Sequence, residues 1–134
     1  MEPFQGRVLS AGVAMYEEAL TYDPKCAEAL YNLAVVHGES KQIRRAILMY
    51  EMCLLVKPDC AEAHNNLGVL YRGMGNVEKA YLCYMAALHI NPKFHQALSN
   101  VAVLYTSQVP FQSPTVYISI LGIQEGKLRL RSYT

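Results

Sequence analysis

The chain repeats with a period of 34 residues, and this repeat limits its possible folds more than any other feature. Pro24, Pro58 and Pro92 are 34 residues apart, and the same spacing relates several other positions. These positions are Ala29, Ala63 and Ala97; Asn32, Asn66 and Asn100; Ala46 and Ala80; and Tyr50 and Tyr84. Small, aromatic and proline residues at fixed offsets indicate a repeated helix-turn-helix unit.

The residue types within the repeat predict pairs of closely packed antiparallel helices. Two helix backbones approach closely only where side chains are small, and the repeat places small residues at fixed positions. Those expected at the contact are Ala34, Gly68, Ala46, Ala80 and Ala87. Each proline then closes a helix pair, because the residue before a proline is displaced from the α region.

Helical periodicity defines where these helices should lie. In the second helix of one unit, apolar residues recur at spacings that place them on one face at 3.6 residues per turn. They are Ala46, Ile47, Tyr50, Cys53 and Leu54. Extending the register along the chain predicts six helices, at 8–22, 27–40, 43–56, 61–73, 77–90 and 95–107.

This pattern resembles the tetratricopeptide repeat. The resemblance implies an all-α fold, a right-handed α-solenoid of antiparallel helix pairs with an irregular C-terminal tail. Two whole repeats span 27–60 and 61–94. Residues 1–26 match the lead-in and second helix of a partial repeat, and 95–108 match the first helix of a third. Residues 109–134 fall out of register.

The tail, VPFQSPTVYISILGIQEGKLRLRSYT, leaves two interpretations open. Pro114 stands where the next small helix-contact residue belongs, so the second helix of the third repeat is not expected. A β-hairpin of 115–121 with 127–132 is one interpretation, although two strands alone are marginally stable. The other is that the tail replaces the continuation of a longer solenoid, as a truncated or altered gene model would. We favour the second, because the helix at 95–107 otherwise lacks its usual partner.

Charge, the N-terminal sequence and cysteine spacing argue against several classes of protein. The formal net charge is +1 with both signs interspersed, which predicts no binding to nucleic acid or to an acidic membrane surface. The first residues lack a signal-peptide pattern and an uninterrupted apolar span, so we expect a nuclear or cytoplasmic location. The four cysteines show no CxxC spacing and are expected to be buried thiols.

No set of residues suited to catalysis is recognisable. The four histidines are not spaced four apart on one predicted helix, and His37 occupies an aromatic core position of the repeat. The glycine-containing GMGN lies in a repeat turn without the strand that precedes a phosphate-binding loop. We therefore expect no cofactor, no metal site and no enzymatic activity from this chain.

A more specific resemblance covers roughly residues 5–108 and is strongest over 60–108. The run CAEAHNNLGVLYRGMGNVEKAYLCYMAALHINPKFHQALSNVAVLYTSQ is similar to the repeats of plant SPINDLY-type protein O-glycosyltransferases, relatives of the O-GlcNAc transferases. That family is implied to modify protein Ser and Thr hydroxyls with a nucleotide sugar and to act in gibberellin signalling. The catalytic domain of the family is absent from these residues, so the resemblance implies a substrate- or partner-binding array.

The resemblance also implies where partners bind. First helices of tetratricopeptide repeats line a concave groove, which here selects Glu28, Tyr31 and Asn32; Glu62, Asn65 and Asn66; and Gln96, Ser99 and Asn100. The family uses an asparagine ladder to hold extended peptides, and Asn32, Asn66 and Asn100 match it. An amide both donates and accepts, so such a column can pair with a peptide backbone. The alternative is that these asparagines cap or brace neighbouring helices.

Two functions remain open at this point. The first is the partner-binding array just described, with extended segments of protein substrates or regulators as ligands and self-association through the unfinished solenoid end as a further option. The second is a free-standing tetratricopeptide adaptor, such as a chaperone cofactor that grips an acidic C-terminal peptide. An adaptor of that kind needs basic groove residues, whereas this chain has Glu28, Glu62 and Gln96 there.

Overall fold

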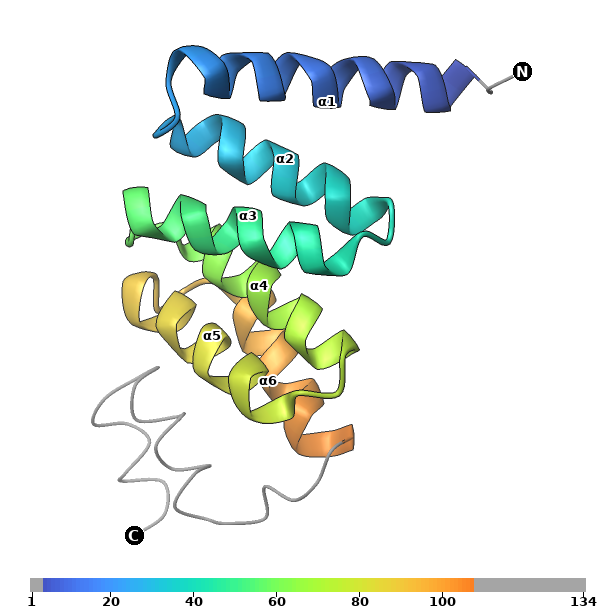
Figure 1. The fold of residues 1–134 in the computed structure, drawn as a ribbon. Helices are drawn as coiled ribbons and strands as arrows, with labels where there is room; N and C mark the ends of the chain where they lie inside the picture. Colours follow the sequence, from blue (N-terminus) through green and yellow to red (C-terminus); the bar gives the residue numbers. More distant parts are fainter. Residues whose placement is uncertain (1–3, 108–134) are drawn as a thin grey trace, which may run out of the picture. The chain divides into compact units, whose positions relative to one another are not determined.

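The structure, a computed structural model, describes residues 4–107, and six helices make up this part of the chain (Figure 1). They are α1 (Phe4–Tyr22), α2 (Ala27–Glu39), α3 (Ile43–Val56), α4 (Ala61–Gly73), α5 (Val77–Ile90) and α6 (His95–Ser107). No strand occurs within 4–107. The chain divides into two compact units, Met1–Asp59 and Cys60–Thr134. Both interpretations of the tail lie outside the described residues.

The helices confirm the periodicity argument. Five of the six begin at the predicted residue, and all six end within one residue of the prediction. The exception at the start is α1, which begins at Phe4, four residues before the predicted Val8. The predicted start came from alignment with the second helices of the later repeats. That alignment gives no information about residues 4–7, so the extension was not predicted. Residues 4–7 contain no proline, so nothing in them breaks a helix that extends toward the N-terminus.

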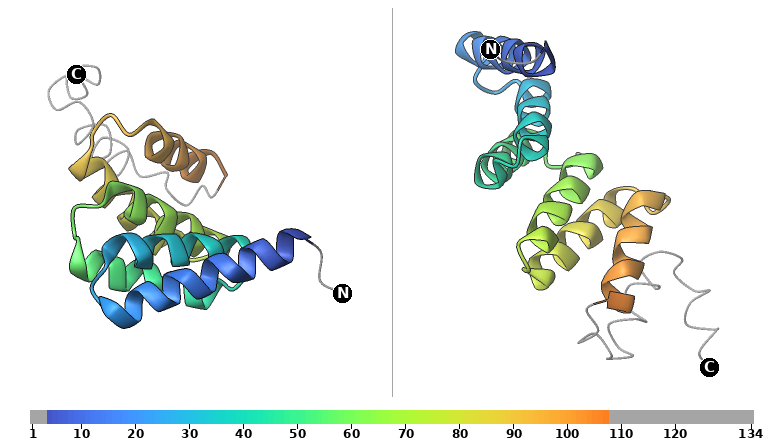
Figure 2. Two further views of the ribbon diagram at one scale, coloured as in Figure 1. Left: turned by 90° about the horizontal axis from the view of Figure 1, so that it is seen from above. Right: turned by 90° about the vertical axis from the view of Figure 1, so that its right-hand side faces the viewer.

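In the first unit, α2 and α3 form an antiparallel hairpin and α1 packs against α2 (Figures 1 and 2). Ala34 and Ala46 are fully buried, as expected of positions where two backbones approach. The rings of Tyr31 on α2 and Tyr50 on α3 meet edge to face, with centroids 5.8 Å apart. Buried apolar residues complete the core of this unit: Ala29, Leu30, Leu33 and Cys53.

The second unit has the same hairpin, made by α4 and α5, and adds α6, which packs against both helices. Its buried core joins residues from all three helices: Ala61, Ala80, Tyr84, Met85, Ala87, Leu88, Ala97, Val101 and Leu104. The predicted contact positions Ala80 and Ala87 are fully buried. Small residues at these positions therefore let α5 approach its neighbours, as the sequence pattern predicts.

Both hairpins turn through the same hydrogen-bonded loop, a Schellman motif. In the first unit the N–H groups of Gln42 and Lys41 donate to the carbonyls of His37 and Gly38, at 2.8 and 3.1 Å. In the second unit the equivalent N–H groups, of Asn76 and Gly75, donate to Tyr71 and Arg72, both at 2.9 Å. This motif requires a left-handed residue just after the helix.

The left-handed position is filled by glycine in one repeat and by lysine in the other. Gly75 has φ of 83° and Lys41, 34 residues earlier, has φ of 64°. A Cβ in this region crowds the backbone, which costs a non-glycine residue about 1 kcal/mol. The lysine therefore holds a strained backbone conformation, which the hydrogen bonds of the Schellman motif stabilise.

We expect Lys41→Gly to stabilise the protein by about 1 kcal/mol, because glycine adopts the left-handed region without strain. Urea denaturation of the variant should show a higher midpoint. The reciprocal change, Gly75→Lys, should lower the stability by a similar amount. Equal midpoints for Lys41→Gly and the parent protein would contradict the strain argument.

The tightest helix contact lies between Gly68 on α4 and Tyr84 on α5. A Cβ at Gly68 would lie 2.6 Å from Cε1 and 2.8 Å from Cδ1 of the tyrosine ring. Tyr84 is fully buried, so its ring cannot swing away into solvent. Burial also raises the pKa of the Tyr84 phenol above its usual value, while the positive charge of Arg72 acts in the opposite direction. Only glycine fits at this place in α4.

Overpacking a core usually costs about 1–3 kcal/mol, and alanine returns about 1 kcal/mol of this through its higher helix propensity. Gly68→Ala should therefore lower the free energy of unfolding by up to about 2 kcal/mol. Gly12→Ala in α1 is the matched control, because a Cβ there meets no atom within 4 Å. Thermal melts should show a lower midpoint for Gly68→Ala and an unchanged or higher one for Gly12→Ala.

Candidate functional site

The predicted groove residues lie on the first helices of the repeats, but they differ in exposure. Four are exposed: Glu28 on α2, Glu62 on α4, and Gln96 and Ser99 on α6. Four more are half-buried: Tyr31, Asn32, Asn66 and Asn100. Asn65 differs from the rest because only 1% of its surface is exposed. Most of the predicted set can therefore reach a ligand, whereas Asn65 is part of the interior.

Asn65 and Asn100 are joined by a side-chain hydrogen bond. The Asn100 amide nitrogen donates to the Asn65 amide oxygen across 2.9 Å, linking α6 to α4. A buried amide without partners would destabilise the fold, so this bond satisfies a need created by the burial of Asn65. For Asn100, the structure therefore supports the alternative that the asparagine braces a neighbouring helix. Asn65 and Asn100 are not equivalent positions of the repeat, because they are 35 residues apart and the repeat period is 34 residues.

The three asparagines of the predicted ladder are divided between the units. Asn32 belongs to the first unit, and Asn66 and Asn100 belong to the second. The stacking of all three asparagines stays a prediction. What the second unit does show is that Asn100 directs its amide nitrogen toward Asn65.

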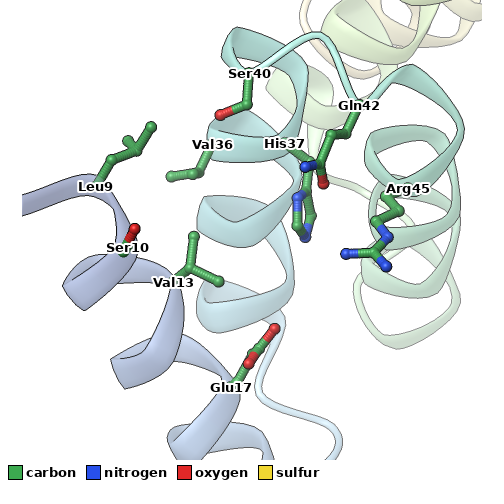
Figure 3. Close-up of a pocket in the computed structure, with 9 residues that line it drawn as sticks. All are labelled: Leu9, Ser10, Val13, Glu17, Val36, His37, Ser40, Gln42 and Arg45. Atoms are coloured by element: carbon green, nitrogen blue, oxygen red, sulfur yellow. The ribbon is translucent and has the colours of Figure 1, made fainter. Parts of the chain in front are cut away.

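A hollow of about 280 Å³ lies among the three helices of the first unit (Figure 3). It is lined by Leu9, Ser10, Val13 and Glu17 of α1, by Val36, His37 and Ser40 at the end of α2, and by Gln42 and Arg45 at the start of α3. The predicted core position of His37 is confirmed, because only 7% of its surface is exposed. Sequence reasoning did not single out Gln42 or Arg45, although an arginine pair in the first turn of a helix was a visible signal.

The described residues provide no evidence of metal or membrane chemistry. Within 4–107, no three His, Cys, Asp or Glu side chains come together as metal ligands would. None of the helices in the same range combines the length and the apolar character that a bilayer crossing needs. The four cysteines are free thiols, but only Cys53 is buried. Cys26, Cys60 and Cys83 are half-buried, so the expectation of buried thiols is wrong for these three.

Known families and structures share this helix-pair fold. Two models of the tetratricopeptide repeat match the chain, one over residues 5–65 and the other over 61–94. Together with the six helices, these matches confirm the predicted fold class, an all-α array of tetratricopeptide helix pairs. A search among curated protein sequences found no match.

Three solved structures illustrate the likeness. MamA is 20% identical with a TM-score of 0.70, covering 90% of this chain and 67% of MamA. The first TPR of Spaghetti (RPAP3), bound to an HSP90 peptide, is 15% identical with a TM-score of 0.72, covering 78% of this chain and 83% of that one. A mutant O-GlcNAc transferase of Thermobaculum terrenum is 26% identical with a TM-score of 0.61 over 80% of this chain. The matching region spans 24% of the transferase chain.

The Asn65–Asn100 bond should be measurable as a coupling energy. Asn65→Ala and Asn100→Ala should each destabilise the protein, and the double variant should lose less than the sum of the two by about 1 kcal/mol. Urea denaturation of the four proteins in this cycle gives the coupling directly. Strictly additive losses would show that the two amides do not stabilise each other.

Proposed function

Because the chain belongs to the tetratricopeptide repeat family, we propose that it binds extended peptide segments of partner proteins along its first helices. The exposed polar residues of α2, α4 and α6 support this role. They recur once per repeat, with Glu28, Glu62 and Gln96 at one position. A fixed spacing of polar groups suits a peptide backbone, which presents donors and acceptors at regular intervals.

The asparagines at the shared groove position are the proposed contacts. Asn32 and Asn66 are half-buried on helices that open a repeat, where an amide can be reached by a ligand while its helix stays packed. Each can donate to a carbonyl and accept from an N–H of the bound chain. Asn100 contributes less in this proposal, because its amide nitrogen is already donated to Asn65.

The finer proposal is that the chain is the substrate- and partner-binding array of a SPINDLY-type protein O-glycosyltransferase, with a nuclear or cytoplasmic location. Two observations support it: the resemblance of residues 60–108 to that family's repeats, and the structural likeness to the Thermobaculum terrenum transferase. The likeness covers 24% of the transferase chain, so the proposal concerns a binding array and not the transferase activity.

A free-standing adaptor is the second candidate, supported by the likeness to the Spaghetti repeat bound to an HSP90 peptide. That peptide, SRMEEVD, carries three acidic side chains. Exposed Glu28 and Glu62 would repel such a ligand if it lay along the same helices. Electrostatic complementarity therefore favours a neutral, Ser/Thr-rich segment over an acidic one.

We expect the double variant Asn32→Ala/Asn66→Ala to bind a disordered Ser/Thr-rich peptide about ten- to a hundredfold more weakly than the parent. The estimate takes about 0.5–1.5 kcal/mol for each hydrogen bond lost. Its melting temperature should change little, because alanine is the better helix former. Fluorescence anisotropy with a labelled peptide measures the affinity.

Asn76→Ala is the control for this experiment. Asn76 caps α5 through a 3.1 Å bond from the Lys79 N–H, so its loss should cost about 1 kcal/mol of stability without a change in affinity. A double variant that melts earlier but binds with unchanged affinity would overturn the groove proposal. Preferential binding of SRMEEVD over the Ser/Thr-rich peptide would favour the adaptor.

A further inference from the structure

The hollow among α1, α2 and α3 gathers hydrogen-bond donors on one side. Figure 3 shows the Gln42 amide, the His37 imidazole and the Arg45 guanidinium directed toward the same space. The opposite side is mixed: Leu9, Val13 and Val36 are apolar, and Ser10 and Glu17 of α1 are polar. A hollow of about 280 Å³ is large enough for one side chain of a ligand. None of its lining residues belongs to the predicted groove set.

One donor of this hollow is already engaged, because the Ser10 hydroxyl donates to the Gly6 carbonyl at 2.9 Å. His37 is 7% exposed, yet its imidazole has no hydrogen-bond partner among the residues that the structure describes. Arg45 and Glu17 line the same hollow but form no ion pair with each other. The ring nitrogens of His37 are not among the fully buried, unpartnered side-chain atoms of the described part of the chain, so they open onto the hollow, where a ligand or water can satisfy them.

The start of α3 adds a second, independent reason to expect an anion. Helix N-termini carry a partial positive charge and unpaired N–H groups, which caps and acidic residues normally offset. In α5, Asn76 caps the helix and Glu78 lies in the first turn. In α3, Gln42 makes no side-chain cap and the first turn has no acidic residue. Instead Arg44 and Arg45 stand there, which adds like charge to the positive end of the dipole.

We propose that this hollow binds an oxyanion, a carboxylate or phosphate group, carried by a side chain of a partner peptide. Arg45 and the free N–H groups at the start of α3 would hold the anion, and His37 and Gln42 would donate to it. The aliphatic part of the ligand side chain would contact Val13 and Val36. Glu17, on the α1 side of the hollow, confines the anion to the α3 side by repulsion.

Three blocked tripeptides test the chemistry of the ligand. Acetyl-Leu-X-Leu-amide is titrated into the isotope-labelled full chain, with glutamate, phosphoserine or glutamine as X. The two charged peptides should shift the NMR signals of the Gln42 and Arg45 side chains and of the Ile43 N–H, and the glutamine peptide should not. Tighter binding of phosphoserine than of glutamate assigns the site to phosphate, and the reverse order assigns it to carboxylate.

Two pairs of matched variants test the location. Arg45→Gln should weaken the charged peptide about tenfold, whereas Arg44→Gln, an equal loss of charge outside the hollow, should change the affinity by less than about twofold. Glu17→Gln should tighten binding about two- to fivefold, and Glu18→Gln should leave it unchanged. All four positions are exposed, so the variants are expected to fold, which circular dichroism verifies.

Three results would each overturn the proposal. They are equal binding of the glutamine and glutamate peptides, equal weakening by the two arginine variants, and no shift with either charged peptide at millimolar concentration. The groove experiment uses other residues and an uncharged peptide, so the failure of one proposal leaves the other standing.

Discussion

The close approach of α4 and α5 at Gly68 and Tyr84 is the contact on which the second unit depends. A buried aromatic ring fills the space that a missing Cβ leaves, and the remaining core residues pack around this pair. In the first unit the corresponding position is Ala34, and the corresponding tyrosine, Tyr50, meets Tyr31 edge to face. Both repeats therefore keep a tyrosine in the second helix, in α3 and in α5. The facing residue in the first helix changes from alanine in α2 to glycine in α4.

The helix positions could be predicted from the sequence because they follow from local physics. Apolar periodicity places each helix, and the prolines that follow α1, α3 and α5 limit where those helices end. The start of α1 was not predicted, because residues 4–7 have no equivalents in the later repeats with which they could be aligned. Lys41 was missed for a related reason: the left-handed conformation belongs to the turn geometry, and lysine carries no signal for it.

The candidate sites were less predictable because they depend on which side chains meet in three dimensions. The repeat assigns Asn65 to the groove, but the structure buries it and pairs it with Asn100. An extra asparagine beside the repeated one was a visible hint, although periodicity alone does not reveal a partner 35 residues away. His37 was correctly placed in the core, and only the packing of α1 against α2 revealed that it also borders a hollow.

The Asn65–Asn100 bond also bears on where this chain can be cut. The repeat ends at residue 94, which makes that residue the natural boundary for an isolated fragment. A fragment ending there would keep the α4–α5 hairpin but lose α6, and with it the donor for a buried amide and the residues that cover Ala61, Tyr84 and Leu88. A fragment of the second unit that keeps this core whole therefore contains three helices. The unit of sequence duplication and the unit that shares one core differ by one helix.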